Sequence, residues 1–506
     1  MSVGERVPPG VDPGPRQPLE NAPATAHASL DRSLVHGIAW TGGVKLAGQV
    51  LAWASTIVVA RLLSPQDYGI VGYATLYVGL ITFLGEFGIG SAIVTLRELD
   101  AHQVAQINTL SVGLGVAGLL LSCLMAYPLS RFFNAPELPW VIVAMSTAFA
   151  ITSFRTVPYA LLQRDLRFKR LAAFEGGQAV VLAATSVLLA LAGFRFWTLV
   201  IANVLGAAIS TGLVLLQHRH PFARPRRGAI DEALNFSRLT LINRVSFYWY
   251  SNADFLVAGK LLGQAAYGAY QLAYSLPLAL LDRTSGLVLR VTPAVLSSVK
   301  HDAAALRRYF LGITEGLALI TFPITIGMAI VADDFVNVAL GERWRPMIVP
   351  LQLLAGYASF RSLIPLVGQL LVATGRNALD TRNSVEMAVV LPIAFLVGSR
   401  WGIVGIAAAW IVAHPFFGLR LIYRACERIE LPVRRYMVAL LPAVTSAFMM
   451  AAALVLLRRT VPAGWPLVAR LALEVAGGGL VYVLALLLFH RGRLLAFRQL
   501  WKSIRA

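Results

Sequence analysis

The chain has 506 residues, of which 57% are hydrophobic and 14% are charged, and its mean hydropathy is +0.69. Soluble domains average about 45–50% apolar and about 25% charged residues. The composition therefore excludes an ordinary soluble protein and predicts a polytopic helical membrane protein. The net charge of +19 does not favour nucleic-acid binding, because the Lys and Arg residues are scattered over short loops and form no single basic face. The two cysteines, Cys123 and Cys426, indicate neither a disulfide framework nor a metal site.

Residues 1–33 are rich in proline and contain no apolar core, which predicts a disordered cytoplasmic tail and argues against a cleavable signal peptide. Fourteen apolar stretches follow, each long enough to cross a hydrocarbon core about 30 Å thick. The first twelve expected spans form two sets of six, 36–60, 68–94, 104–129, 138–162, 171–192 and 196–217, then 236–262, 266–295, 309–331, 347–374, 378–398 and 402–423. Two more, 436–457 and 466–489, complete the chain.

A short polar turn at 60–69 (ARLLSPQDYG) recurs in weaker form at 259–268 (GKLLGQAAYG), 199 positions later. At this offset four residues are identical, with Leu62, Leu63, Tyr68 and Gly69 corresponding to Leu261, Leu262, Tyr267 and Gly268. A second similarity relates 197–200 to 401–404 at an offset of 204. Repetition at such a spacing is typical of membrane transporters built from two related halves.

The apolar stretches and the duplication predict an all-α membrane protein of about 14 transmembrane helices, with two pseudo-symmetric lobes of six helices and two additional helices. The expected boundaries are a disordered tail at 1–33, an N-lobe at 34–217, a basic cytoplasmic linker at 218–235, a C-lobe at 236–424, two additional helices at 425–489 and a basic cytoplasmic tail at 490–506.

The distribution of Lys and Arg between alternate loops predicts the orientation. With the N-terminus in the cytoplasm, the cytoplasmic loops and tails carry 27 basic residues and the opposite loops carry ten. Cytoplasmic loops of membrane proteins are enriched in Lys and Arg. We therefore expect both termini in the cytoplasm.

Seven basic residues lie within the expected spans, where a charge at a helix centre costs at least about 2.5–3.5 kcal/mol. Arg238 lies near a span end and is expected to snorkel. The other six are Lys45, Arg155, Arg244, Arg283, Arg290 and Arg361. Because all six lie at mid-depth or toward the cytoplasmic side, we expect a positively charged cavity that binds a phosphate-bearing substrate. The alternative is that these bases pair with acids and only hold helices together.

Polar and aromatic residues mark the seventh expected span, which contains Phe247–Tyr250 followed by Ser251–Asp254. Tyr248 and Asn252 are candidates for contact with a saccharide, although aromatic residues at helical spacing also pack in cores. Glu86, Asp254 and Asp282 are candidates for coupling to H⁺ or Na⁺. The alternative is that these acids are structural partners of nearby bases, with Asp254 in the neighbourhood of Arg244. No cofactor or metal is expected.

Several short motifs in the right order resemble bacterial polysaccharide flippases. They are the 60–69 turn, EFGIGSA at 86–92, LLQRDLRF at 161–168, NAD at 252–254, LG at 262–263 with GAY at 268–270, and LGERWRP at 340–346. The resemblance is to the O-antigen and exopolysaccharide exporters of the multidrug/oligosaccharidyl-lipid/polysaccharide superfamily and covers about 33–430. These exporters often have Asp where this chain has Glu86.

The resemblance implies two lobes in a V around a central cavity, two extra C-terminal helices and alternating access. The implied substrate is an undecaprenyl-diphosphate-linked oligosaccharide, moved from the cytoplasmic to the periplasmic leaflet of the bacterial inner membrane. The implied partners are this lipid-linked glycan, the bilayer, and a polysaccharide polymerase or other assembly proteins.

Two other functions are weighed against this expectation. A multidrug cation exporter of the same superfamily should have an acidic cavity, whereas the bases of this chain predict a basic one. A membrane enzyme of polysaccharide assembly would need carboxylates or a metal site on a loop. Asp333 and Asp334 are the only such pair, and they are expected on a short loop.

Overall fold

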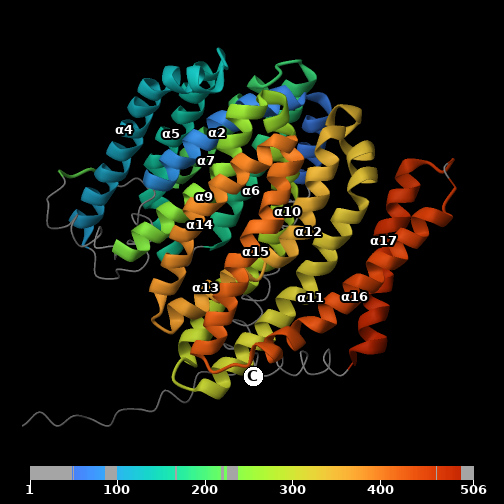
Figure 1. The fold of residues 1–506 in the computed structure, drawn as a ribbon. Helices are drawn as coiled ribbons and strands as arrows, with labels where there is room; N and C mark the ends of the chain where they lie inside the picture. Colours follow the sequence, from blue (N-terminus) through green and yellow to red (C-terminus); the bar gives the residue numbers. More distant parts are fainter. Residues whose placement is uncertain are drawn as a thin grey trace, which may run out of the picture.

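The computed structural model describes residues 48, 51–85, 100–165, 168–217, 221–224, 238–462 and 464–491. Within these ranges the chain is all-helical, and nine helical stretches are long and apolar enough to cross a membrane (Figure 1). The expected tail at 1–33, most of the linker at 218–235 and nearly all of the tail at 490–506 lie outside the described residues.

The helices of the two expected lobes follow the predicted spans closely. In the first half, a helix at 51–62 precedes α2 (Pro65–Gly85), α4 (Ala101–Phe133), α5 (Leu138–Arg164), α6 (Phe168–Leu191) and α7 (Trp197–Gln217). The second half contains α9 (Arg238–Leu262), α10 (Gln264–Ser298), α11 (Ala303–Phe335), η1 (Val336–Leu340), η2 (Glu342–Met347), α12 (Ile348–Arg361), α13 (Ile364–Ala373), α14 (Asn377–Gly398), η3 (Ser399–Trp401) and α15 (Gly402–Arg428). The last two are α16 (Val433–Thr460) and α17 (Leu467–Phe489), which Figure 1 shows at the edge of the molecule, far from α4 and α5.

The start of α2 is defined by the first copy of the repeated turn. The hydroxyl of Ser64 donates to Asp67 Oδ2 at 2.6 Å, and the backbone N–H of Asp67 donates back to Ser64 Oγ at 3.2 Å. Pro65 occupies the first helical position, where its missing N–H costs nothing. In the second copy Gly263 takes the place of Ser64, with φ at 83°, before α10 begins. We call the end of the helix bundle that carries Ser64 and Gly263 the motif end.

The two copies of the turn meet where α2 crosses α10. A Cβ on Gly69 would lie 2.1 Å from the carbonyl oxygen of Gln264, and a Cβ on Gly268 would lie 1.9 Å from that of Pro65. Both distances are far below contact distance, and both neighbours are backbone atoms. Only glycine at these positions lets the helices approach so closely.

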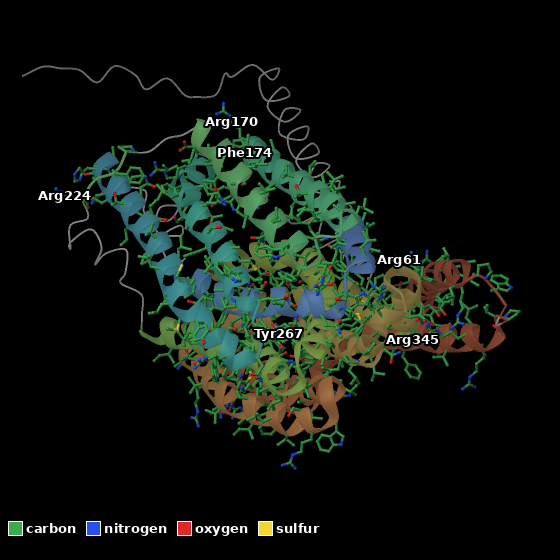
Figure 2. All side chains as sticks on the ribbon, turned by 90° about the horizontal axis from the view of Figure 1, so that it is seen from above. Arg61, Arg170, Phe174, Arg224, Tyr267 and Arg345 are labelled. Atoms are coloured by element: carbon green, nitrogen blue, oxygen red, sulfur yellow. The ribbon has the colours of Figure 1, made fainter. Side chains whose placement is uncertain are left out.

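Hydrogen bonds between side chains of one half and backbone carbonyls of the other close the seam beside this crossing. The hydroxyl of Tyr267 donates to Gly72 O at 3.0 Å, and that of Tyr73 donates to Gly259 O at 3.1 Å. The two rings lie 4.6 Å apart, and Tyr267 lies near the middle of the molecule seen from above (Figure 2). Three further bonds of this kind join Gln264 to Gln66 O, Trp344 to Ala60 O and Lys260 to Phe132 O. The two halves are therefore held together at the motif end.

One expected span is broken in two. The stretch 347–374 was expected to be a single helix, but it forms α12 and α13, which are separated at Ser362 and Leu363. Pro365 is the physical reason, because it has no N–H to donate back to the carbonyl of Arg361 and its ring would clash with that carbonyl in a continuous helix. Arg361 therefore lies in the last turn of a half-helix inside the membrane.

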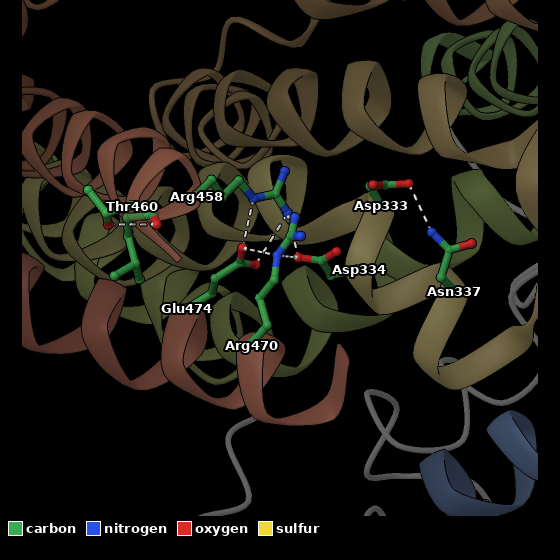
Figure 3. Close-up of polar contacts among 8 residues, drawn as sticks. Asp333, Asp334, Asn337, Arg458, Thr460, Arg470 and Glu474 are labelled. Carbon is green, nitrogen blue, oxygen red and sulfur yellow. Dashed lines mark hydrogen bonds and ion pairs between the residues drawn. The ribbon is translucent and has the colours of Figure 1, made fainter. Parts of the chain in front are cut away.

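Two buried carboxylates and two arginines attach α16 and α17 to α11 (Figure 3). Arg458 binds Glu474 at 2.8 Å and Asp334 at 3.2 Å, and Arg470 binds Asp334 at 2.9 Å. The expectation that Asp333 and Asp334 lie on a loop was wrong. Both are in the last turns of α11, because the ion pairs let the helix carry Asp334 into the protein interior.

We predict that Gly268→Ala disfavours the closed seam by about 1–3 kcal/mol, the usual cost of overpacking. The added Cβ would collide with the backbone of Pro65. In a background with Gln66→Cys and Gln264→Cys, the yield of a short bifunctional cross-linker should fall. Gly356→Ala is the control, since no heavy atom lies within 4 Å of its added Cβ. Equal cross-linking in both variants would contradict the crossing.

We also predict that Glu474→Gln lowers the free energy of unfolding by about 3–5 kcal/mol, because it leaves buried arginine charge uncompensated. Thermal unfolding of the purified protein measures the effect. Glu342→Gln is the matched control, because that carboxylate is 89% exposed and pairs with Arg345 only at 3.9 Å. The control should change stability by about 1 kcal/mol or less. A Glu474→Gln protein as stable as this control would show that the buried cluster does not hold the last two helices.

Candidate functional site

The centre of the second half is a buried carboxylate bound by neutral donors. Asp254 of α9 is completely buried. Its Oδ2 accepts hydrogen bonds from Trp410 Nε1 at 2.9 Å and from Tyr270 Oη at 2.8 Å, and its Oδ1 accepts one from the backbone N–H of Phe255 at 2.9 Å. Buried polar groups need such partners. Asp254 thereby connects α9, α10 and α15.

Arg361 lies directly beside this carboxylate network. Its Nη1 donates to Tyr274 Oη at 2.6 Å, and its guanidinium carbon lies 5.5 Å from the ring centre of Tyr274 and 5.6 Å from that of Trp410. Both ring faces attract a cation. The partial negative charge at the end of α12 also favours a cation there. Trp410 therefore links the buried acid to the partly buried base, because its N–H binds Asp254 and its ring contacts Arg361.

Asp254 and Arg361 are surrounded by further aromatic side chains that were not expected from the sequence. Tyr357 stacks on Trp410 with ring centres 5.5 Å apart, and His414 contacts both rings at 5.4 and 5.7 Å. Tyr357, Trp410 and His414 are all buried. The spacing of Tyr267, Tyr270 and Tyr274 places their rings on one helix face, and this pattern could have drawn attention to α10.

Arg283 and Arg290 continue along α10 from this network. Arg283 is exposed, and its guanidinium lies 5.6 Å from the ring centre of Trp53, which belongs to the helix at 51–62 in the first half. It therefore reaches across the space between the halves. It follows Tyr274 by nine residues, or about 13 Å along the helix. Arg290 is also exposed, as is Asp282 beside Arg283.

The remaining candidate bases are not brought to this network in the described part of the chain. Arg155 of α5 hydrogen-bonds Ser210 of α7 and, at 3.3 Å, Gln178 of α6, all within the first half. Lys45 and Glu86 lie outside the described residues, and so does the side chain of Arg244.

Tyr248 and Asn252 lie on the seam between the halves. The Tyr248 hydroxyl donates to Leu76 O of α2 at 2.8 Å, and Asn252 Nδ2 donates to Tyr248 O at 2.8 Å. Both side chains line an apolar groove between α2, α4 and α9. A role in saccharide contact stays a prediction for these two residues.

We predict that Asp254→Asn destabilises the fold, because an amide has one acceptor oxygen and its NH₂ group would face N–H and O–H donors. A buried unsatisfied group costs about 1–3 kcal/mol, and thermal unfolding measures this loss. Asp282→Asn on the adjacent helix α10 is the control, since Asp282 is exposed. If both variants were equally stable, the three bonds to Asp254 would have no structural role.

The sequence model of the family described as "Polysaccharide biosynthesis protein" matches residues 58–349, more than half of the chain. The lipopolysaccharide biosynthesis protein WzxC of Escherichia coli K12 is 23% identical over 394 residues, which cover 76% of this chain and 79% of WzxC. The teichuronic acid biosynthesis protein TuaB of Bacillus subtilis 168 is 24% identical over 355 residues, which cover 69% and 73% of the two chains.

Two solved structures show the fold. The lipid II flippase MurJ in an inward closed conformation superimposes with a TM-score of 0.69 at 14% identity, over 90% of this chain and 99% of MurJ. An inward-facing multidrug resistance MATE family transporter of the MOP superfamily gives a TM-score of 0.62 at 14% identity, over 76% and 94%. The fold is therefore shared with these two transporters, as the resemblance implied. From the family match, the chain belongs to the polysaccharide biosynthesis protein family.

Proposed function

We propose that this protein is a flippase that moves undecaprenyl-diphosphate-linked oligosaccharide from the cytoplasmic to the periplasmic leaflet by alternating access. The named functions of relatives support this substrate class, since they act in lipopolysaccharide, teichuronic acid and succinoglycan biosynthesis. One archaeal relative is named a probable glycan biosynthesis flippase. We assign no enzymatic reaction to the chain itself.

The observation that carries the proposal is the setting of Arg361. A guanidinium has five N–H donors, and among the described residues its hydrogen-bond partner is Tyr274. Arg361 forms no ion pair with a described carboxylate within 4.0 Å. Its charge is therefore held by a phenol and two ring faces and stays available to phosphate oxygens, which guanidinium groups bind in bidentate fashion.

Arg283 supplies a second positive charge at the space between the halves, roughly two and a half helical turns from Tyr274. Two and a half turns place Arg283 on the opposite face of α10 from Tyr274, so the two arginines would contact different parts of a headgroup with a diphosphate and several sugars. Two arginines disfavour the alternative multidrug cation exporter, whose cargo they would repel.

The closed seam at the motif end supports alternating access. With the topology predicted from the sequence, the motif end faces the periplasm, and Arg283 lies just past the middle of α10 toward the cytoplasm. Separation of α2 from α10 at the glycine crossing would then release the headgroup outside. In this proposal the lobes are 34–217 and 236–424, both termini are cytoplasmic, and a polysaccharide polymerase receives the product.

The coupling of transport to an energy source is part of the proposal. Glu86, Asp254 and Asp282 remain the acids through which H⁺ or Na⁺ could act, and a membrane potential acting on the charged headgroup is the alternative. Asp254 is bound by three neutral donors. A proton gained or lost at Asp254 would therefore alter its hydrogen bond with Trp410 and, through Trp410, the environment of Arg361.

We predict that the double substitution Arg283→Gln and Arg361→Gln abolishes export while the protein level stays normal. Reconstituted protein is assayed with labelled lipid-linked glycan, scored for exposure in each leaflet. Losing one hydrogen-bonded ion pair to phosphate costs about 1.5–3 kcal/mol, so each single variant should lose at least about tenfold in affinity.

Arg345→Gln is the control, because this arginine is 63% exposed and lies at the motif end. Arg361→Lys tests geometry, since an ammonium keeps the charge but loses the planar donor fork. Normal flipping by the double variant would remove the two arginines from the binding site. Transfer of sugar by the purified protein alone would replace the transport proposal with an enzymatic one.

A further inference from the structure

An apolar groove lies along the seam between the halves and is lined by α2, α4 and α9. Its cavity volume is about 200 Å³, which corresponds to roughly seven water molecules at ~30 Å³ each. This volume suits a short run of a hydrocarbon chain and is too small for an oligosaccharide. Its walls come from both halves and include Leu76, Leu80, Phe83, Phe132, Val245 and Trp249.

The groove is largely apolar, and four of its polar side chains donate to backbone carbonyls. The Tyr248 hydroxyl donates to Leu76 O, Asn252 Nδ2 to Tyr248 O, and Trp249 Nε1 to Ala388 O at 3.1 Å. Tyr73 donates to Gly259 O. Each of these four donors binds a backbone carbonyl. Ring faces and aliphatic carbons therefore make up most of the surface that could contact a ligand.

The depth of the groove in the membrane follows from the helices that line it. On α9 it extends from Val245 to Leu256, a rise of about 16 Å, or half of a hydrocarbon core about 30 Å thick. On α9 this stretch lies about 9–26 Å from Leu262 at the motif end, and on α2 the lining extends to Phe83, near the opposite end of that helix. The groove therefore spans the middle of the membrane and is not confined to one leaflet.

We propose that this groove holds the polyisoprenoid chain of the lipid-linked substrate across the middle of the membrane while the headgroup lies between the halves; this inference rests on the proposed function. A chain attached to a headgroup between the halves must leave through a seam, and this groove lies on a seam formed by both halves. The stiff, methyl-branched chain has the apolar faces that aromatic walls contact well. Ala253 lines the groove and precedes Asp254, so a bound chain would contact the helix that holds the Arg361 network.

The test uses full-length protein in nanodiscs and a polyprenyl diphosphate with a diazirine on its isoprenoid chain. We expect photolabelled peptides from 76–83 and 245–256. Unlabelled polyprenyl diphosphate should compete, and an equal excess of phosphatidylglycerol should not. Equal competition by the phospholipid would show that the groove takes bulk lipid, and labelling confined to other helices would place the chain elsewhere. Either result overturns the proposal.

Filling the groove provides a second measurement. Val245→Trp and Leu80→Trp should each reduce labelling about tenfold by displacing buried chain methylenes, because both side chains line the groove and are 46% and 38% exposed. Leu120→Trp is the control, since Leu120 of α4 is 65% exposed and lies outside the lining. Unchanged labelling in both groove variants would contradict the site.

A geranyl diphosphate-linked glycan separates the two proposals, because its chain is too short to fill the groove while its headgroup is intact. Its binding should depend on Arg361 and be unaffected by Val245→Trp. If it binds normally but the long chain does not label the groove, only the groove proposal fails. If neither this glycan nor the long-chain glycan binds, the proposed function fails as well.

Discussion

The close crossing of α2 and α10 is the constraint on which the arrangement of the two halves depends. Two backbone segments approach so closely at Gly69 and Gly268 that a single added carbon would lie within 2.1 Å of a carbonyl oxygen. This approach brings Tyr73 and Tyr267 within reach of carbonyls on the opposite half. Interactions between small residues and hydrogen bonds drive helix association where lipid offers no hydrophobic force. Buried apolar residues of both halves, among them Ile70 and Ala74 of α2 and Ala269 and Ala273 of α10, pack in the same cluster and add to these polar contacts.

A second constraint acts within the second half. Pro365 ends α12 in mid-membrane, and the break places Arg361 at a helix end whose dipole favours a cation. Trp410 then joins Arg361 to Asp254 without an ion pair, because its N–H donates to the carboxylate and its ring face contacts the guanidinium. A direct salt bridge would neutralise the arginine and leave less charge for a phosphate. The indole separates the two charges while keeping both in one network.

Sequence patterns predicted the helices and the two halves well, since apolar length and a repeat at one offset are direct consequences of a duplicated membrane bundle. They could not predict that the repeated turns face each other, because contact between distant segments is not encoded in spacing. The break at Ser362 was also missed, since Pro365 inside a span is compatible with a bend or an end, and packing decides between them. Arg361 and Asp254 were recognised by their charge in an apolar stretch. Trp410 and His414 were not, because apolar and aromatic residues there read as ordinary packing.

Helix α9 connects the seam, the groove and the network of the second half. Asp254 binds α10 and α15 and so ties α9 to the second half, while Tyr248 and Lys260 donate to carbonyls of α2 and α4 in the first half. Opening of the motif end must therefore break the bonds that Tyr248 and Lys260 make to the first half and preserve those that Asp254 makes within the second half. A neutral hydrogen bond contributes about 0.5–1.5 kcal/mol net, and one from a charged donor such as Lys260 about 1.5–3 kcal/mol. These bonds therefore contribute a few kcal/mol to the free-energy difference between the two states, the size of difference that a ligand can shift. A headgroup at Arg361 and a chain beside Ala253 would both act on this one helix, which makes α9 the element through which bound substrate can influence the seam.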